Sequence, residues 1–345
     1  IDWKPLIYHK SPPILSTIYD VYQMRKTVFH INKTKRFSLV HCRGYLPALI
    51  GLQMKEKFGT KFIFDMRGFW ADEKVDAGAW NLSKLHYRWV YRYFKRKEKE
   101  FFTQADCSVS LTHTGKKEIL SWEYMQRRKD NISVIPCCAD TDLFDIHQVS
   151  EVDKIDYSAK LKISVDTQVL TYLGSIGTWY MLEDMLDFFI EYKKTHFASK
   201  FLFITHDEHD RIQFEASKRG ISHDILLYPA MRGEVPKLIA LSTHSIFFIR
   251  PTYSKMSRSP TKQGELMAMG VPIICNEGVG DTDSIVHQYR SGVTISSFTE
   301  KSYQDAIEKL QGTKFNAENI RVNAKEYFGL NKGIENYLMI YKNVC

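Results

Sequence analysis

Short runs rich in β-branched and aromatic residues alternate with longer segments of helical periodicity along the whole chain. This alternation is typical of βα units, in which helices connect the parallel strands of a sheet and pack on it. With 345 residues, the chain is too long for one ordinary core and has the length of two open α/β domains. The expected strands are residues 5–8, 38–42, 61–65, 107–111, 132–135, 168–173, 200–205, 224–227, 244–249, 271–275 and 292–295. The expected helices include residues 45–58, 114–126, 182–192, 233–241, 301–310 and 334–343.

The segment 136–145, which reads PCCADTDLFD, has the features of a connector between two domains. It follows an expected strand, opens with proline and contains turn-forming residues. We therefore predict a first domain over residues 1–143, a second over 144–328, and a C-terminal helix within 329–345 that can cross back to the first. Open sheets of this type normally begin with a strand and a loop near the ligand, so we expect the first domain to lack its N-terminal start.

Several classes of protein are disfavoured by composition. The longest apolar stretches fall short of the roughly 18 residues that a membrane-spanning helix needs. The first residues lack the basic and apolar regions of a secretory signal. Six scattered cysteines without a CxxC pair argue against a zinc ribbon and against a disulfide framework. We expect a cytoplasmic protein with buried thiols.

Positive charge is concentrated in the first part of the chain. Residues 1–143 carry 25 Lys and Arg against 15 Asp and Glu, a net charge of +10, whereas the remainder carries 23 against 25, a net charge of −2. Within the first part, residues 84–100 read KLHYRWVYRYFKRKEKE, with helical spacing that places Trp89 and Tyr93 on one face. Two interpretations remain open: a helix that meets an anionic membrane surface, or a solvated helix whose aromatic residues enter the core. The sequence contains no nucleic-acid-binding motif, and we expect no nucleic-acid partner.

Residues 259–269 are expected to form a short helix whose start binds an anion. Ser259 is the predicted N-cap, Pro260 the first helical residue, and Gly270 the residue that ends the helix. The first backbone N–H groups of such a helix lack carbonyl partners and attract anions. Lys262 adds a cation where the helix dipole disfavours one, and further cations lie just upstream. We predict that this crowding is relieved by a bound pyrophosphate. The upstream cations are Arg250, Lys255 and Arg258.

A second candidate phosphate loop is YLGSIGT, residues 172–178, which follows an apolar strand and precedes a helix. Gly174 and Gly177 allow close approach of the backbone to a ligand. The loop differs from GxGxxG, and the acidic residue that would bind an NAD ribose is not evident, which disfavours a dehydrogenase. The chain also lacks GxxxxGK[ST], which excludes a P-loop NTPase.

Three of these segments resemble the glycosyltransferases of family 4, which have the two-domain GT-B fold. IPCCADTDLF at 135–144 is similar to the interdomain link, 172–177 to the first loop of the donor domain, and SPTKxxE at 259–265 with Gly270 and Pro272 to the donor-site helix. The resemblance implies two Rossmann-like domains with parallel sheets that face each other across a cleft. It also implies a nucleotide-sugar donor, retention of anomeric configuration and no metal or other cofactor.

The resemblance also implies roles for individual residues. Glu265 matches the family carboxylate that holds the donor ribose, whereas the first carboxylate of the same pair is replaced here by Ser257. The loop at 228–233 is similar to the wall that binds the base. The catalytic candidates are Arg67, Lys262 and Arg250. The donor-binding candidates are Gly174, Ser175, Gly177, Arg232, Ser257, Arg258, Ser259, Thr261, Lys262 and Glu265.

Acceptor-side candidates follow two strands of the first domain. Trp70 suits either sugar stacking or packing of its loop, and Asp72 and Glu73 suit hydrogen bonds to sugar hydroxyls. His113 follows another strand end, where open sheets bind ligands, although a solitary histidine is more often structural.

Taken together, the sequence predicts a glycosyltransferase acting with a UDP- or GDP-type donor on a glycan or lipid-linked glycan, in bacterial surface polysaccharide synthesis at the cytoplasmic face of the membrane. Two alternatives remain open: a GT-B nucleotide-sugar epimerase, and a degenerate, non-catalytic GT-B binding protein.

Overall fold

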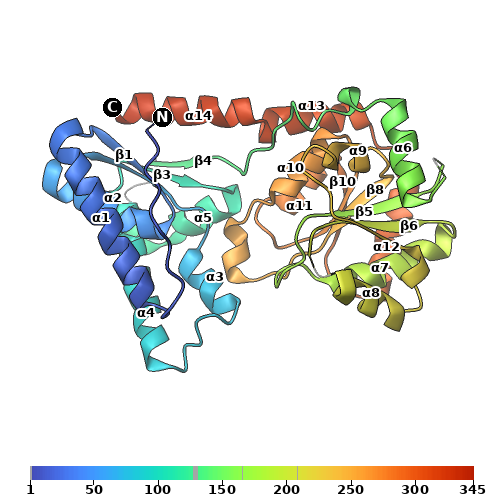
Figure 1. Cartoon of the computed structure of the whole chain (residues 1–345), viewed down its shortest axis with the longest axis horizontal. Coiled ribbons are helices and arrows are strands. Elements are labelled where there is room, and N and C mark those ends of the chain that lie inside the picture. The colour runs from blue at the N-terminus through green and yellow to red at the C-terminus, as the bar shows by residue number, and fades with distance from the viewer. Residues whose placement is uncertain (1, 127–130, 165, 208) are drawn as a thin grey trace. The chain divides into compact units, whose positions relative to one another are not determined.

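A computed structural model describes residues 2–126, 131–164, 166–207 and 209–345 (Figure 1). The chain divides into two compact units. Unit 1 comprises residues 1–135 and 336–345, and unit 2 comprises residues 136–335. The division therefore falls before Pro136, at the start of the expected connector, whereas the sequence placed the boundary after Leu143. The last residues of the C-terminal helix belong to unit 1.

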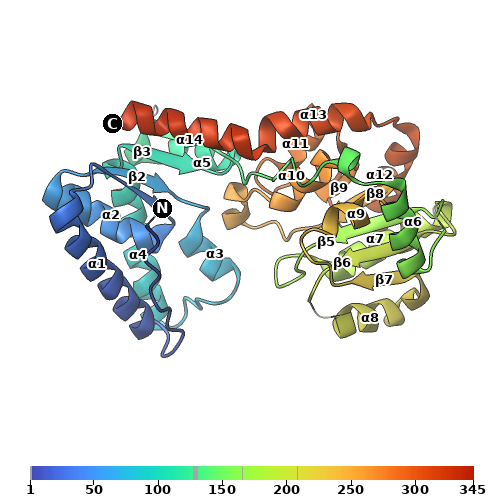
Figure 2. The same cartoon turned by 45° about the horizontal axis from the view of Figure 1, so that its top comes forward.

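Unit 1 is built on a wholly parallel four-stranded sheet in the order β1-β2-β3-β4. Helices α2 and α4 both contact β2, and α1 contacts α2, so three helices lie on one side of this sheet (Figure 2). The strands are β1 (Leu39–Arg43), β2 (Lys61–Asp65), β3 (Cys107–Ser110) and β4 (Ile132–Val134). The helices are α1 (Leu15–Lys35), α2 (Tyr45–Phe58), α3 (Trp70–Asp76), α4 (Leu85–Gln104) and α5 (His113–Ser121).

The beginning of unit 1 differs from the prediction. Residues 5–8 form no strand, and the expectation of a strand there is wrong. They are exposed and extended, and the long helix α1 follows them before the first strand, β1. Trp3, Ile7 and Tyr8 are mostly exposed, so the aromatic and β-branched residues that suggested a strand do not enter a sheet.

Unit 2 has a six-stranded parallel sheet in the order β10-β9-β8-β5-β6-β7, with helices on both faces (Figure 1). In chain order this is the 3-2-1-4-5-6 arrangement of a doubly wound Rossmann sheet. The strands are β5 (Val169–Leu173), β6 (Lys200–Ile204), β7 (Ile225–Tyr228), β8 (His244–Phe247), β9 (Ile273–Asn276) and β10 (Gly292–Ile295). The helices are α6 (Glu151–Leu161), α7 (Leu182–Thr195), α8 (His209–Lys218), α9 (Val235–Ile239), α10 (Thr261–Ala268), α11 (Thr282–Gln288), α12 (Glu300–Gly312) and α13 (Ala317–Phe328), followed by α14 (Leu330–Val344), which ends in unit 1.

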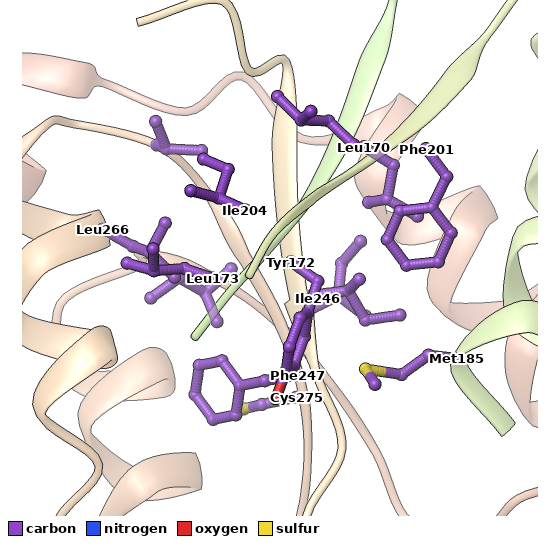
Figure 3. Close-up of a cluster of buried hydrophobic side chains, with 14 of the residues drawn as sticks. Leu170, Tyr172, Leu173, Met185, Phe201, Ile204, Ile246, Phe247, Leu266 and Cys275 are labelled. Carbon is purple, nitrogen blue, oxygen red and sulfur yellow. The ribbon is translucent and has the colours of Figure 1, made fainter. Parts of the chain in front are cut away.

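The core of unit 2 explains why its strands are almost continuously apolar. A parallel sheet covered on both faces buries every side chain of its central strands. All five residues of β5 are buried. Met185 of α7 and Leu266 of α10 approach this strand from opposite sides (Figure 3). The short helix α10 is therefore held directly on the sheet, which fixes the position of its first turn.

A partly buried histidine makes unit 2 sensitive to acid. Burial lowers the pKa of His244 on β8 to about 4, with a further contribution from His196. Its Nδ1 lies 2.9 Å from the Tyr192 hydroxyl. Between pH 6.5 and 4 the unfolded chain binds a proton that the folded protein does not. The free energy of unfolding therefore decreases by up to about 3 kcal/mol as the pH is lowered across this range. Urea unfolding of His244→Gln against the wild type is expected to show a smaller loss of stability across this range, and equal losses in both would contradict the assignment.

Cysteine burial and helix hydropathy bear on two further expectations. Cys42, Cys107 and Cys275 are buried free thiols, as expected, whereas Cys137 and Cys138 are only partly buried and Cys345 is exposed. Within the described part of the chain, no helix is both long and apolar enough to span a bilayer.

Candidate functional site

The strand order of unit 2 locates its ligand-binding edge. Order reverses between β5 and β8, and doubly wound sheets bind ligands outside the carboxyl ends of the strands at such a reversal. The loop after β5 and the loop after β8 meet at this edge: Met181 N–H donates to the Phe248 carbonyl (3.0 Å), and Arg250 N–H donates to the Trp179 carbonyl (2.9 Å). The segment that follows β5 and the segment that follows β8 therefore lie side by side at this edge.

The loop after β5 has the backbone that its glycines predicted. Gly174 and Gly177 have φ of 99° and 47°, in the left-handed region. A Cβ on Gly174 would lie 3.4 Å from the Lys262 Nζ, an ordinary van der Waals contact, so this loop runs beside the lysine amine. The Ser175 hydroxyl donates to the Asp207 carboxylate. This contact anchors the loop to the segment after β6.

Helix α10 begins one residue later than predicted. Its N-cap is Pro260 and its first residue is Thr261, and no side chain in the described structure caps it. The predicted N-cap, Ser259, instead accepts a hydrogen bond from the Cys137 N–H (3.1 Å). The helix ends as expected, with Gly270 at φ 76°. The uncapped first turn retains the donors that an anion would use.

Lys262 is the most unusual side chain of the site. The residue is 8% exposed, and its Nζ has no hydrogen-bond partner among the described residues. The ammonium lies 3.6 Å and 4.1 Å from the ring centres of Tyr180 and Tyr172. Burial holds the pKa of Lys262 well below the usual value for lysine, and the nearby Glu265 carboxylate offsets this in part. Because an unsatisfied buried ammonium is costly, this geometry favours binding of an anion.

The other predicted cations differ from Lys262 in burial and in their aromatic contacts. Lys255 is buried, with its Nζ 3.3 Å from the ring centre of Trp179. Arg250 and Arg258 are exposed, and Arg258 is close enough to Tyr180 to oppose the rise that burial causes in the tyrosine's pKa. Lys262 and Arg258 thus both lie near Tyr180, while Lys255 makes a cation–π contact with the neighbouring Trp179.

Glu265 is brought together with the predicted base-binding loop. Arg232, in the loop after β7, donates from Nη1 to Glu265 Oε1 at 2.7 Å. The Arg232 guanidinium also lies 4.6 Å from the ring centre of Phe144. Glu265 is buried whereas the Arg232 side chain is largely exposed, so the arginine end of this ion pair is the end that solvent reaches.

Ser257 occupies the position where the resembled family has its first carboxylate. It is fully buried, and its hydroxyl donates to the Ser254 carbonyl at 3.1 Å. The side chain therefore stabilises the turn before α10. A serine held in this way supplies none of the negative charge that a glutamate would supply.

The acceptor-side candidates lie in unit 1, and two of them, Trp70 and Asp72, make structural contacts within that unit. Asp72 is buried and accepts hydrogen bonds from the Tyr91 hydroxyl (2.8 Å) and the Lys95 ammonium (2.9 Å), both on α4. Trp70 packs edge-to-face on Trp80 and Phe94 at ring distances of 5.2 Å and 4.9 Å. The structure thus assigns both a role in joining α3 to α4.

The remaining candidates of unit 1 lie near the carboxyl ends of its strands. Arg67 follows β2 and has φ of 59°, and Glu73 is partly buried on α3. His113 is exposed at the first position of α5, after β3. His41, on β1, lies against α14, with its Nδ1 2.8 Å from the Tyr341 hydroxyl.

Sequence reasoning missed the aromatic surroundings of the lysines. Tyr172 and Tyr180 enclose Lys262, and Trp179 covers Lys255. The signal was present, because these three aromatic residues occupy or flank the glycine loop. Cation–π contacts of this kind depend on tertiary packing, which spacing alone does not show.

Comparisons with solved structures show the fold. The chain is similar to sucrose-phosphate synthase from Thermosynechococcus elongatus (TM-score 0.72, 14% identity, 97% of this chain and 80% of that chain). It is also similar to HepE from Anabaena in complex with UDP and glucose (TM-score 0.70, 12% identity, 97% and 84%). A third similar structure is the apo form of WaaB, a lipopolysaccharide outer core galactosyltransferase (TM-score 0.61, 14% identity, 95% and 81%). The fold is GT-B.

The family is shown by a sequence comparison. No curated protein sequence matches the chain. The family model described as glycosyl transferases group 1 matches residues 153–327, which is half of the chain and includes β5, α10 and the loops between them. The chain therefore belongs to the group 1 glycosyl transferases.

Proposed function

We propose that the chain transfers a sugar from a UDP- or GDP-type donor to a glycan or lipid-linked glycan acceptor, with retention of configuration, as a member of family 4. The observation that carries the proposal is the buried Lys262 ammonium, which lies beside the Gly174 loop and the uncapped start of α10. Phosphate oxygens are the acceptors that these donors lack. The similar HepE structure holds UDP and glucose, which supports a nucleotide-sugar donor.

In this proposal, protein cations stabilise the leaving diphosphate. Negative charge grows on the diphosphate as its bond to the sugar breaks, and fixed donors in a dry site lower the energy of that state. Lys262, Arg250 and the first turn of α10 supply the donors, with Arg258 at the exposed side. No metal or other cofactor is needed for this step. Arg67 is the third residue that we propose to be catalytic.

The nucleoside part of the donor is proposed to bind between Glu265 and the loop at 228–233. The Glu265 carboxylate accepts from the ribose hydroxyls, and Arg232 orients the carboxylate through their ion pair. Backbone groups of the loop contact the base. In this proposal the diphosphate also contacts the loop beside Lys262, through Gly174, Ser175 and Gly177.

The acceptor is proposed to be held by unit 1 at an anionic membrane surface. The net charge of +10 over residues 1–143, with its basic segment 84–100, supports a peripheral location at the cytoplasmic face. The similarity to WaaB, a lipopolysaccharide galactosyltransferase, supports a role in surface polysaccharide synthesis. Glu73 and His113 are the proposed acceptor contacts, because Asp72 is hydrogen-bonded to α4.

A non-catalytic sugar-nucleotide-binding protein is the second candidate. The observation that favours it is Ser257, whose buried hydroxyl is turned toward the Ser254 carbonyl. Without a carboxylate at this position, the donor sugar loses one expected contact.

Sugar transfer can be tested with radiolabelled UDP- and GDP-sugars, with and without a lipid extract of bacterial membranes. A transferase is expected to move the label into the lipid or glycan fraction and to release nucleoside diphosphate only with acceptor. Rearrangement of the nucleotide sugar without acceptor would indicate an epimerase. Nucleotide binding without turnover of any donor would indicate the non-catalytic protein.

A further inference from the structure

Unit 1 contains a cavity that none of the proposed reaction steps uses. Its volume is about 760 Å³, within the range of about 300–1,000 Å³ typical of small-molecule sites. The walls come from α1, α2, α3 and α4, together with the extended segment before α1. Most of its lining is apolar or aromatic, and its charged lining residues, all in the described part of the chain, are Lys10 and Lys74.

Helix α4 presents two adjacent exposed rows beside this cavity. Leu85, Trp89 and Tyr93 follow each other at four-residue intervals and are 66%, 72% and 45% exposed. Trp89 and Tyr93 also line the cavity. The second row consists of three exposed arginines at the same interval: Arg88, Arg92 and Arg96.

Helix α1 provides a matching apolar edge on the other side of the cavity. Ile18 lines it, and Leu15, Tyr19 and Tyr22 are exposed on the same helix. Large side chains exposed on two helices, around one apolar cavity, indicate a surface that is covered by apolar material. Because a row of arginines borders this surface, the covering material is expected to carry negative charge beside its apolar part.

We propose that this cavity binds one hydrocarbon chain of an anionic membrane lipid, while the arginine row of α4 binds the lipid phosphates. Trp89 and Tyr93 lie at the boundary between chain and headgroup, where amphipathic aromatic rings are favoured in membranes. The inference deepens the proposed function, since it rests on a membrane-bound acceptor and names the lipid contact of the unit that holds it.

A sugar fits this cavity less well than a hydrocarbon chain. Sugar sites need several hydrogen-bonding groups to replace the water around hydroxyls. Among the described lining residues, the polar groups besides the two lysines, the tyrosine hydroxyls and the tryptophan N–H groups are those of Ser16 and Thr17. The apolar lining instead includes Leu46, Leu49, Val21, Val90 and Phe94.

The test uses a single-chain anionic lipid, lysophosphatidylglycerol with a brominated acyl chain, below its micelle concentration. Bromine quenches tryptophan at short range, and Trp70, Trp80 and Trp89 line the cavity. Quenching is expected to saturate at one lipid per protein. The headgroup alone, glycerophosphoglycerol, is expected to compete poorly, and the zwitterionic lysophosphatidylcholine to bind more weakly.

Two variants separate the cavity from the surface around it. Thr17→Trp fills the cavity from α1, and loss of room for about two methylene groups weakens lipid binding about tenfold. Trp89→Ala removes the aromatic rim and is expected to lower both lipid affinity and cosedimentation with phosphatidylglycerol vesicles. Phe197→Ala removes an aromatic residue of unit 2 that is also mostly exposed and is the matched control, with no expected effect.

Several results would overturn the proposal. They are unchanged lipid binding in Thr17→Trp, equal binding of the headgroup alone, competition by oligosaccharides, or a dimer that Trp89→Ala dissociates in the absence of lipid. The nucleotide-induced rise in melting temperature is measured on the same proteins. This rise reports on the donor site of unit 2. If the wild type responds to nucleotide but does not bind the lipid, the lipid inference alone is wrong. If it binds the lipid but does not respond to nucleotide, the proposed donor site alone is wrong.

Discussion

Lys262→Met is expected to abolish detectable binding of nucleoside diphosphate while making the free protein more stable. The Lys262 amine is buried without a hydrogen-bond acceptor among the described residues, so a methionine of similar length removes an unsatisfied polar group from the free protein. A buried donor that lacks its hydrogen bond costs about 1–3 kcal/mol, so the variant is expected to gain about this much stability. In the complex, the same change removes one fixed donor to the diphosphate, which costs about 100-fold in turnover or more.

Calorimetric titration with UDP and GDP, together with thermal unfolding, measures both effects. Lys301→Met is the matched control, because that lysine is mostly exposed on α12 and pairs with Asp305. The control is expected to leave binding and stability nearly unchanged. A Lys262→Met protein that binds nucleotide normally would show that this ammonium does not face the donor.

The same lysine gives nucleotide binding a pH dependence. Burial lowers the pKa of Lys262 in the free protein, and a bound diphosphate raises it. Between these two pKa values binding takes up a proton, so the affinity for nucleoside diphosphate falls as the pH rises. Titrations in buffers of different ionisation enthalpy are expected to show proton uptake in the wild type. Proton uptake of the same size in Lys262→Met would contradict this origin.

Gly264→Ala is expected to destabilise unit 2 by about 1–3 kcal/mol, although alanine is the better helix former. Gly264 lies within α10, and a Cβ there would be 2.8 Å from the Phe328 Cβ and 3.2 Å from the Ala139 Cβ. Helix α10 packs closely on α13, so the added methyl group pushes the two helices apart. Because Lys262 and Glu265 lie on the same helix, nucleotide affinity is expected to fall as well.

Gly312→Ala provides a comparison of opposite sign. Gly312 ends α12, and a Cβ there would meet nothing within 4 Å. This change is expected to stabilise the protein by up to about 1 kcal/mol through helix propensity and loss of unfolded-chain freedom. Urea unfolding of the two variants side by side measures the difference. A Gly264→Ala protein as stable as Gly312→Ala would show that α10 and α13 separate without cost.

Most of the sheet structure was predictable from sequence, because parallel strands buried on both faces have short, apolar patterns. Strands 61–65 and 292–295 and helix 45–58 were predicted with the observed bounds. Helix α1 was missed for a physical reason: the residues that it buries, Ser16 and Asn32, are polar, and its apolar side chains are partly buried or exposed, which blurs the helical period. The exposed ones, such as Ile18 and Tyr22, belong to the cavity edge described above.

The site was predictable as a set of segments, but its contacts were not. Glycines and the SPTK pattern depend on local backbone geometry, and they indicated the loop and helix that meet at the strand reversal. The ion pair between Arg232 and Glu265 and the turn that buries Ser257 depend on tertiary packing. The role of Asp72 in joining α3 to α4 could not be predicted for the same reason, because its hydrogen-bond partners lie on α4.

The most direct test of the account is a thermal-shift panel with UDP, GDP, ADP, CMP and NAD on the wild-type chain and on Lys262→Met. A ligand that binds the folded state raises its stability by an amount that grows with the logarithm of ligand concentration over Kd. We predict that UDP or GDP alone raises the melting temperature of the wild type, and that Lys262→Met melts higher without ligand but shows no such rise. No response to either nucleoside diphosphate, or an equal response in both proteins, would contradict a donor site at α10.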